Sequence, residues 1–334
     1  GTYGFPESHA ASFALLVYAS AWLKCHYPEV FTCALLNAQP MGFYSPAQLI
    51  ADAQRSGVEV RPVDINYSAW DSTIEQVPQA RHALRLGLRL VKGLNAVEAA
   101  RITACRSESY QSVEDIITRS DISAKTIELI AAADGLRSLG LNARQGFWQA
   151  RKQGRLQMNK LPLFAQADNR TKIIKQDDDS YLKLPPSLFG EQIAQDYTAT
   201  GLSLKGHPVD SLKAWFEKDR WQGCSAIDEA PNGRRLRLIG LVTMRQRPGT
   251  AKGTVFVTIE DSLLSVNVIV WPHIVERDRT ALLGAHLMGV YGRLQRQGPI
   301  THFIAESVHN CDSYLGFLHA SDQQAPRLKS RDFH

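Results

Sequence analysis

Hydrophobic and polar positions follow two different periodicities along the chain. The first part has the spacing of helices, and the last part alternates as strands do. Through about the first seventy residues, apolar side chains recur three and four positions apart, which predicts amphipathic helices. A first helix is expected to run to about Lys24 with Ser8 as its N-cap, and Pro28 is placed to open a second. Residues 45–48 combine a serine cap, an N1 proline and an N3 glutamine, and Gly57 is expected to end that third helix.

The middle of the chain, about 84–152, changes to short helices joined by tight turns. Residues 58–66 alternate like a short strand before it. Within 88–102 an apolar stretch meets a turn at 93–95 and continues as a helix, and residues 134–140 repeat the theme with further glycines. Such a turn leaves backbone N–H groups unpaired at a helix N-terminus, where they and the helix dipole attract a phosphate. The pattern predicts helix-hairpin-helix units, and by itself it leaves DNA binding open.

An interval of low order is expected at 153–200. It is rich in glutamine and contains the acidic run 177–179 and the diproline 185–186. Consecutive aspartates can hold a divalent metal for phosphoryl transfer. No predicted strand frames them and lysines flank them, so a solvated linker is the favoured interpretation. Structure is expected to return at 200–218, which ends in a helix.

Alternation marks the last large segment, 234–310. The pattern predicts three strands, a helix bounded by Pro272 and Gly284, and two more strands. The strands are expected at 235–247, 254–260, 265–271, 286–296 and 300–307. Three strands, one helix and two strands is the order of an OB barrel. The fold class expected for the chain is multidomain α+β, with helical domains followed by a C-terminal five-stranded OB barrel.

The predicted barrel begins in a concentration of positive charge. Between Arg234 and Asp261, six basic residues are accompanied by two acidic ones, within a chain of net charge +5. OB barrels commonly bind single strands through a basic groove with aromatic platforms, and they also serve as protein-docking modules. Trp271 is open to two interpretations, a base platform or a core or rim residue. The single-strand candidates are Arg237, Arg245, Arg247, Lys252, Trp271, Arg293 and Arg296.

Composition narrows the class of protein. A hydrophobic content of 44% over 334 residues is enough for two or three cores, and no apolar run reaches the length of a membrane span. Five scattered cysteines without a Cys-x-x-Cys pair predict free thiols rather than zinc or a disulfide framework. No leader with a charged and an apolar part stands at the N-terminus, so we expect a cytoplasmic protein with no membrane partner.

Several phrases of the sequence resemble one protein family. Residues 3–31, YGFPESHAASFALLVYASAWLKCHYPEVF, resemble the fingers stretch of C-family bacterial replicative polymerases, the family of the DNA polymerase III alpha subunit. Residues 62–66, 88–101 and 200–210 and the OB barrel follow in that family's order, and the resemblance covers about 3–320. The features that resemble its error-prone mutasome branch are Glu7, RSLGLNARQGFWQAR, LPLF at 161–164, and the terminal SRDFH.

The resemblance implies a C-terminal fragment of a DNA-directed DNA polymerase. In this family magnesium held on the palm, upstream of the fingers, supports polymerisation. The parent would be the enzyme, and this fragment would hold no cofactor and would be inactive alone. The implied organisation is a part of the polymerase fingers at 1–80, a helix-hairpin-helix duplex-binding domain at 81–155, a linker at 156–199, a connecting helical segment at 200–233, an OB fold at 234–312 and a tail at 313–334.

The resemblance also implies site residues in the helical part. Ser8 and His9 would lie near the nucleotide in the fingers, and a capping role at a helix start is an equal alternative for His9. The residues that match the family's duplex-binding hairpin are Lys92, Gly93, Leu94 and Asn95. Asn95 replaces the second glycine of a Gly-x-Gly turn. Because asparagine tolerates left-handed backbone geometry, we expect the turn to survive this change.

Residues 160–164 resemble a degenerate sliding-clamp motif. Lys160 stands where the family's motif has glutamine, and the apolar positions that remain are Leu161, Leu163 and Phe164. In the error-prone branch a mutasome partner of Y-family-like type (ImuB-like) is thought to bring the clamp. The resemblance therefore implies an indirect contact with the sliding clamp.

Two functions of different class follow from these features. The leading hypothesis is the DNA-holding and partner-docking portion of an error-prone translesion polymerase acting in SOS-induced mutagenesis. The hairpin domain would hold the duplex of a primed template and the barrel its single-stranded template, with the Y-family-like partner and a RecA-like accessory as protein partners. The alternative is a protein-interaction module in which the barrel and a flexible, basic tail dock mutasome partners with little DNA binding. A free-standing single-strand-binding protein is disfavoured, because two thirds of the chain precedes the barrel.

Overall fold

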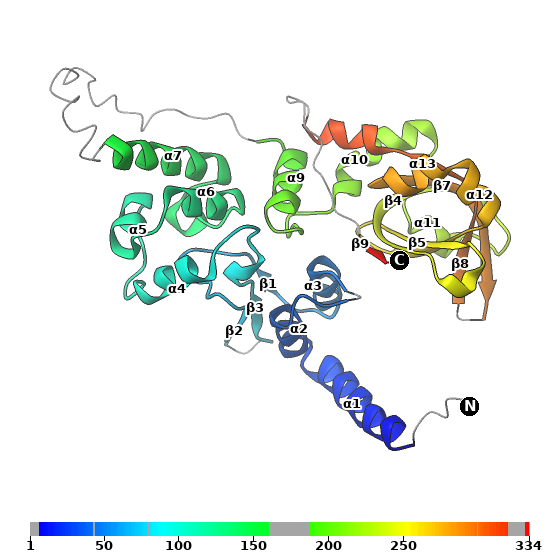
Figure 1. Cartoon of the computed structure of the whole chain (residues 1–334), viewed down its shortest axis with the longest axis horizontal. Helices are drawn as coiled ribbons and strands as arrows, with labels where there is room; N and C mark the ends of the chain where they lie inside the picture. Colours follow the sequence, from blue (N-terminus) through cyan, green and yellow to red (C-terminus); the bar gives the residue numbers. More distant parts are fainter. Residues whose placement is uncertain are drawn as a thin grey trace. The chain divides into compact units, whose positions relative to one another are not determined.

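The chain folds into two compact units that exchange short segments. The computed structural model describes residues 7–42, 44–78, 81–159, 187–298, 300–319 and 331–333. The first unit comprises residues 1–185 and 199–204, and the second comprises residues 186–198 and 205–334. Each unit is described by itself below, and Figure 1 gives the labels of the elements.

The first unit begins with three helices whose ends agree with the sequence pattern. They are α1 (Glu7–His26), α2 (Pro28–Asn37) and α3 (Pro46–Arg55). Pro28 occupies the start of α2 as predicted. The capping box before α3 is confirmed, because the Ser45 hydroxyl accepts from the Gln48 N–H and the Gln48 side chain accepts from the Ser45 N–H. Helix α1 starts before Ser8, however, so the predicted N-cap at Ser8 is wrong.

A small three-stranded sheet follows these helices. Its strands are β1 (Val60–Arg61), β2 (Thr73–Glu75) and β3 (Ala83–Arg85), in the order β1-β3-β2. The strand expected at 58–66 is therefore only two residues long. Pro62 has no N–H to donate to a ladder, and the residues after it turn towards the following helices.

The rest of the first unit is the expected set of short helices and tight turns. Its elements are η1 (Leu88–Leu90), α4 (Ala96–Ala104), α5 (Val113–Ser120), α6 (Ala124–Ala132), η2 (Arg137–Leu139) and α7 (Ala143–Asn159). Their inward side chains join those of α2, α3 and the sheet in one hydrophobic core that includes Ile65, Ile102 and Ile130. The interval expected to be a linker, 156–199, thus begins inside α7.

The second unit contains several short helices before and after the barrel strands. They are α9 (Phe189–Ala199), α10 (Pro208–Phe216), η5 (Glu217–Asp219), α11 (Ala226–Glu229) and η7 (Asp312–His319). Helix α9 also falls in the interval expected to be a linker. The helix expected near the end of 200–218 is α10. His207 caps it, because its Nδ1 accepts a hydrogen bond from the Val209 N–H at 3.3 Å.

The OB barrel is confirmed in the second unit. Its strands are β4 (Arg235–Gln246), β5 (Val255–Glu260), β6 (Ser265–Val270), β7 (Leu287–Gln297) and β8 (Ile300–Asn310), with α12 (Pro272–Arg277) and α13 (Arg279–Gly284) between β6 and β7. The sheet order is β5-β6-β8-β7-β4, and a further β4–β5 pairing closes it (Figure 1). One helix was expected after β6, and it is split in two at Asp278.

The C-terminal tail contributes a last short strand to this sheet. Strand β9 (Arg331–Phe333) pairs in parallel with Met244–Gln246 of β4. The tail was expected to be flexible on its own, and this prediction is wrong for these three residues. Their backbone groups satisfy an edge of β4 next to the end of its pairing with β7.

Candidate nucleic-acid interface

The first hairpin, residues 91–95, joins η1 to α4 and turns at a left-handed glycine. Gly93 lies in the left-handed region at φ 81°, which a glycine adopts without strain. Leu94 packs into the core with 9% of its surface exposed, so it holds the turn against the core of the first unit. The Lys92 N–H donates to the Ala199 carbonyl at 2.8 Å, while the Lys92 side chain is exposed. The turn survives the asparagine at position 95, as predicted.

Asn95 supports this turn in a way that the sequence reasoning did not foresee. Its backbone is extended, at φ −88° and ψ 133°, and is not left-handed. Its side chain is the N-cap of α4, because Asn95 Oδ1 accepts from the Val97 N–H at 2.8 Å. The Asn95 side chain therefore pairs with one of the backbone N–H donors at the start of α4. Asn95, Ala96 and Val97 are exposed and form the outer surface of the turn.

Glu98 holds the first hairpin against the helices that follow it. Its carboxylate accepts from the Ser123 N–H at 3.2 Å and from the Thr126 hydroxyl, at the N-terminus of α6. Burial raises the pKa of Glu98, but the hydrogen bonds from Thr126 and Ser123 outweigh it, and the pKa lies below its usual value. The carboxylate is thus charged at neutral pH and ties α4 to α6.

A second hairpin, residues 139–142, repeats the first in sequence and in geometry. Gly140-Leu141-Asn142-Ala143 has the same four residues as Gly93-Leu94-Asn95-Ala96. Gly140 is left-handed at φ 73°, and Asn142 precedes α7 as Asn95 precedes α4. Asn142 Oδ1 accepts from the Gln145 N–H at 2.9 Å, and Gln145 Oε1 accepts from the Asn142 N–H at 3.1 Å. The repeated tetrapeptide was the signal that could have identified 140–143 as candidate site residues from the sequence.

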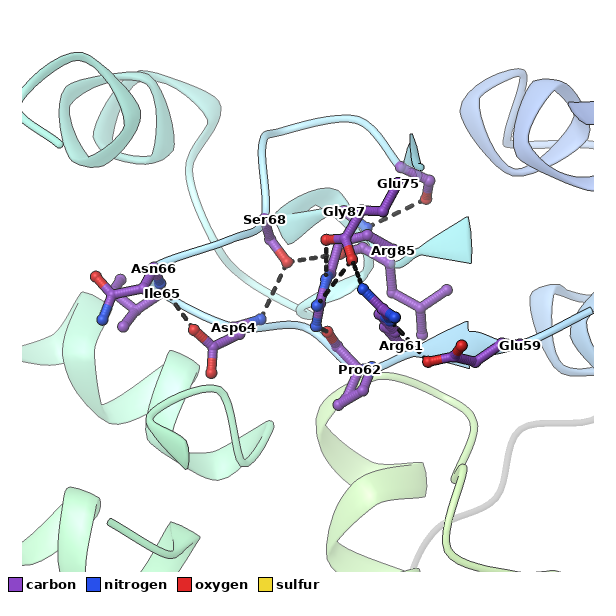
Figure 2. Close-up of polar contacts among 12 residues, drawn as sticks. Glu59, Arg61, Pro62, Asp64, Ile65, Asn66, Ser68, Glu75, Arg85 and Gly87 are labelled. Carbon is purple, nitrogen blue, oxygen red and sulfur yellow. Dashed lines mark hydrogen bonds and ion pairs between the residues drawn. The ribbon is translucent and has the colours of Figure 1, made fainter. Parts of the chain in front are cut away.

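The second hairpin is held by residues 64–66, named here the polar anchor. Figure 2 shows Asp64 and Asn66 in the segment after β1. Asp64 Oδ2 accepts from the Ser138 N–H at 3.1 Å, and Asn66 Nδ2 donates to the Ser138 hydroxyl at 3.0 Å. The Ile65 N–H donates to the Gly135 carbonyl at 2.8 Å. The anchor therefore fixes the backbone that leads into Gly140.

A charged network connects the strands of the small sheet and reaches Pro62, two residues before the polar anchor (Figure 2). Glu75 Oε1 accepts from Arg85 Nε at 2.6 Å, and Glu75 Oε2 accepts from Arg61 Nη1 at 2.5 Å. Arg85 also donates to the Pro62 carbonyl at 2.9 Å. The hydrogen bond from Arg85 is the main reason why the pKa of Glu75 lies below its usual value, with Arg61 adding to it. Through the Pro62 carbonyl, this network holds the backbone just before residues 64–66.

In the barrel, two of the predicted DNA contacts are engaged inside the fold. Arg245 is 6% exposed and donates through Nε to the Leu282 carbonyl at 2.7 Å and through Nη2 to the Ala285 carbonyl. Arg296 donates through Nη2 to the carbonyls of Ile227 and Asp228. The prediction of a DNA contact is wrong for Arg245, because its guanidinium is buried. Arg296 is partly buried against α11, so we assign it a structural role too.

Three other predicted residues, Arg247, Lys252 and Trp271, lie close together and are called the loop cluster. Arg247 and Lys252 are exposed in the connection between β4 and β5, and Trp271, 45% exposed, directly precedes α12. A Cβ placed on Gly253 would lie 3.8 Å from Arg247 Nη2 and 3.7 Å from Pro272 Cγ, so the connection runs beside the start of α12. The exposed side chains beside the cluster include Phe256 on β5.

Arg237 and Arg293 do not belong to the loop cluster. They lie near the start of β4 and on β7, where Arg237 pairs with Tyr291 and Arg235 with Arg293. The Arg237 guanidinium lies 4.5 Å from the ring centroid of Trp221, and Arg293 is exposed. The seven predicted barrel residues therefore separate into a loop cluster, two strand residues and two structural arginines.

Several predicted residues cannot be placed in this way. Ser8 and His9 lie in the first turn of α1, and their side chains are outside the described part of the chain. Leu161, Leu163 and Phe164, and the acidic run 177–179, lie outside the described residues altogether. Within the described ranges, no group of three His, Cys, Asp or Glu side chains could hold a metal ion. No helix among the described residues is long and apolar enough to cross a membrane.

Comparison with known proteins places these features in a family. Residues 57–146, which contain both hairpins and the polar anchor, match a family described as "Helix-hairpin-helix motif". The chain is 44% identical over 326 residues to error-prone DNA polymerase 2 of Rhizobium meliloti, covering 96% of this chain and 30% of that protein. It is 42% identical over 329 residues to error-prone DNA polymerase of Brucella abortus, covering 98% of this chain and 30% of that protein. A solved structure, asparaginyl-tRNA synthetase from Pyrococcus horikoshii, is 21% identical over 27% of this chain and 22% of its own, with a TM-score of 0.24.

The chain spans about 30% of the length of the curated relatives that it matches. The identity runs through the helical unit and the barrel alike, because it covers 94% or more of this chain in each of these relatives. The resemblance noted from residues 3–31 and 62–66 is thereby confirmed. Over nearly its whole length the chain is homologous to a portion of error-prone DNA polymerases.

Proposed function

We propose that this chain is the C-terminal, DNA-holding portion of an error-prone translesion polymerase that acts in SOS-induced mutagenesis. The two hairpins would bind the sugar-phosphate backbone of the duplex, and the loop cluster of the barrel would receive the single-stranded template. The observation that carries the proposal is the repeated Gly-Leu-Asn-Ala turn, because each copy presents a left-handed glycine at the N-terminus of a helix. A helix N-terminus offers backbone donors and a partial positive charge to a phosphate.

Catalysis would belong to the parent protein. We propose that magnesium is held on its palm and that the present portion holds no cofactor and does not polymerise DNA alone. Its residues would instead position the primed template through phosphate contacts, which carry affinity without sequence information. The loop cluster adds two cations and Trp271, which suits the backbone and bases of an unpaired strand.

The experiment that tests this proposal places a carboxylate at each turn. Gly93→Asp with Gly140→Asp should lower duplex affinity at least tenfold, because a negative charge meets the phosphate at both turns. A Cβ meets nothing within 4 Å at Gly140 and only Leu129 methyls at 3.8 Å and 3.9 Å at Gly93, so the side chains fit. Aspartate and asparagine both tolerate positive φ. Fluorescence anisotropy with labelled duplex across a salt series measures the effect.

The matched control is Gly93→Asn with Gly140→Asn, which has nearly the same shape without the charge. The control should retain duplex affinity within about threefold. For every phosphate that the aspartate variant no longer binds, the slope of log affinity against log salt should become shallower by about 0.9. Equal affinities for the aspartate and asparagine variants would contradict phosphate binding at the turns.

A second candidate function is partner docking, which we propose alongside DNA holding. Trp215 of α10 and Phe317 of η7 stack with ring centroids 4.4 Å apart and are 43% and 46% exposed. Paired aromatic side chains of this kind are enriched in protein interfaces. A mutasome partner of Y-family-like type and a RecA-like accessory are the proposed partners, with the sliding clamp reached indirectly. Trp215→Ala should weaken such a partner's binding and leave DNA affinity unchanged.

A further inference from the structure

Helix α7 continues from the second hairpin as an unusually basic helix. Its 17 residues, ARQGFWQARKQGRLQMN, contain four basic residues and no acidic one. Arg144, Trp148 and Lys152 follow one another at intervals of four, so they lie along one stripe of the helix surface. All three are exposed, and Trp148 exposes 45% of its surface. At 1.5 Å per residue the stripe is about 12 Å long.

The opposite side of α7 fixes the direction of this stripe. Ala150 is fully buried, and a Cβ on Gly146 would lie 2.8 Å from Leu136 Cδ1. A Cβ on Gly154 would lie 2.9 Å from the Cβ of Ala124. Small residues at these positions let α7 pack closely on α6 and the turn before it, so the helix cannot rotate to bury Trp148.

An acidic group beside this part of α7 pairs with a residue outside the stripe. Glu128 of α6 pairs with Arg151 at 3.4 Å, and the Arg151 guanidinium also lies 4.6 Å from the ring centroid of Phe147. Arg151, whose side chain is 60% exposed, thus lies at the flank of the stripe, between it and α6. The stripe itself carries cations at both ends and a flat aromatic surface in the middle.

This combination fits an unpaired DNA strand better than a duplex. In a duplex the base faces are stacked on one another, so an exposed indole has little to pack against. A single strand offers a phosphate for each cation and an open base face for the ring, and such stacking is worth about 1–3 kcal/mol per base. We propose that Arg144, Trp148 and Lys152 form a separate binding site for unpaired nucleotides that adjoin the duplex, with Trp148 as the stacking platform. The placement next to a duplex rests on the proposed function of the second hairpin.

The test compares three substrates in the full chain by fluorescence anisotropy: blunt duplex, the same duplex with an oligo-dT overhang, and oligo-dT alone. Trp148→Ala should weaken overhang and oligo-dT binding about thirtyfold, the middle of the range for a single base stack, and leave blunt duplex unchanged. Trp148→Phe keeps an aromatic face and should stay within about threefold of the natural chain. Arg144→Gln with Lys152→Gln should reduce the salt slope on oligo-dT by about 1.4, at about 0.7 per cation.

A second readout separates this site from the barrel. Oligo-dT carrying 5-iodouracil is irradiated in complex with the chain, and the cross-linked peptides are mapped by mass spectrometry. We expect an adduct at Trp148. Adducts confined to the barrel, with unchanged affinity in Trp148→Ala, would overturn the inference. Competition by polyglutamate as strong as that by oligo-dT at equal ionic strength would also overturn it, since the stripe would then be an acidic-peptide site.

The inference and the proposed function fail in different ways. If the Gly93→Asp with Gly140→Asp chain loses duplex binding while Trp148→Ala leaves overhang binding intact, the stripe is wrong and the hairpins stand. If Trp148→Ala weakens oligo-dT binding while the Gly93→Asp with Gly140→Asp chain keeps the duplex affinity of the natural chain, the stripe binds single strands and the hairpin function is wrong.

Discussion

Single residues decide whether an arginine in this chain can meet DNA or supports the fold. Arg245 and Arg247 are two positions apart on an alternating strand, and the sequence pattern treats them alike. The pairing of β4 with β5 shifts register between Val242 and Met244, and after that shift Arg245 pairs with the buried Val257. Strand β4 ends at Gln246, so Arg247 lies in the exposed connection to β5 while Arg245 stays in the sheet and faces inward. Alternation alone cannot show where the strand ends or which of its faces is buried, so this error was inherent in the pattern.

His207 is a titratable residue whose burial the sequence pattern also did not reveal. The sequence marks it only as part of a resembling phrase, whereas the structure buries it as the N-cap of α10. Burial lowers the pKa of His207 to about 4, although Asp210 and Asp261 oppose the shift. Above about pH 7 the residue is neutral in both the folded and the unfolded chain. As pH falls from about 6.5 towards 4, only the unfolded chain binds the proton, so folding stability is lost over this window.

We therefore predict that His207→Asn flattens the acid limb of the stability curve. Asparagine keeps an N-cap acceptor and does not titrate, so up to about 3 kcal/mol of acid destabilisation should disappear at pH 4. Urea unfolding between pH 7 and pH 4 measures this. His273→Asn, the same substitution at an exposed histidine, provides the control. Parallel curves for His207→Asn and the natural chain would show that another group governs acid unfolding.

At the level of elements, the barrel was predictable in detail and the hairpin domain only in outline. Each barrel strand was predicted from alternation, and every connection except the one between β5 and β6 contains glycine or proline, so local signals and fold largely agree. The second hairpin depends instead on contacts across more than seventy positions, such as Asp64 with Ser138. No local pattern encodes such a contact. The repeated tetrapeptide was visible in the sequence, but its meaning came from the two positive φ values and the two asparagine caps.

The polar anchor should therefore control the second hairpin without touching DNA. Asp64→Asn replaces an acceptor with a donor opposite the Ser138 N–H, so amide exchange at 135–142 should speed up while 91–96 stays protected. Duplex affinity should fall about three- to tenfold, because the loosened turn must be ordered on binding. Hydrogen–deuterium exchange and anisotropy provide the two measurements. Asp121→Asn makes the same charge change at a fully exposed side chain and serves as the control.

An unchanged exchange pattern at 135–142 in Asp64→Asn would refute the anchoring role. Faster exchange throughout the first unit would point to general destabilisation rather than to a local effect on the turn.

At the level of the whole molecule, α1 is the element with the most uncovered apolar surface among the described residues. Leu15, Leu16, Val17 and Tyr18 are 61–71% exposed, and Phe13, Trp22 and Leu23 are 38–51% exposed. Contiguous apolar surface of this kind marks an interaction site. We predict that the chain self-associates through α1 in a concentration-dependent way.

Light scattering across a concentration series measures this association. Leu15→Glu with Tyr18→Glu should shift the chain towards monomer, and Leu263→Glu, at an equally exposed leucine of the second unit (67% exposed), should leave association unchanged. A monomer at every concentration in the natural chain would refute the prediction.

The path of the backbone through the two units limits how the molecule can be divided. The chain enters the second unit at 186, returns to the first for 199–204, and re-enters the second at 205. In that return Leu202 is buried in the core of the first unit and the Ala199 carbonyl accepts from the Lys92 N–H of the first hairpin. No single cut releases two complete folding units. A protease that cleaves between 187 and 205 leaves one product without part of its core, so an expression boundary drawn at residue 200 would damage the hairpin domain together with the helices packed beside the barrel.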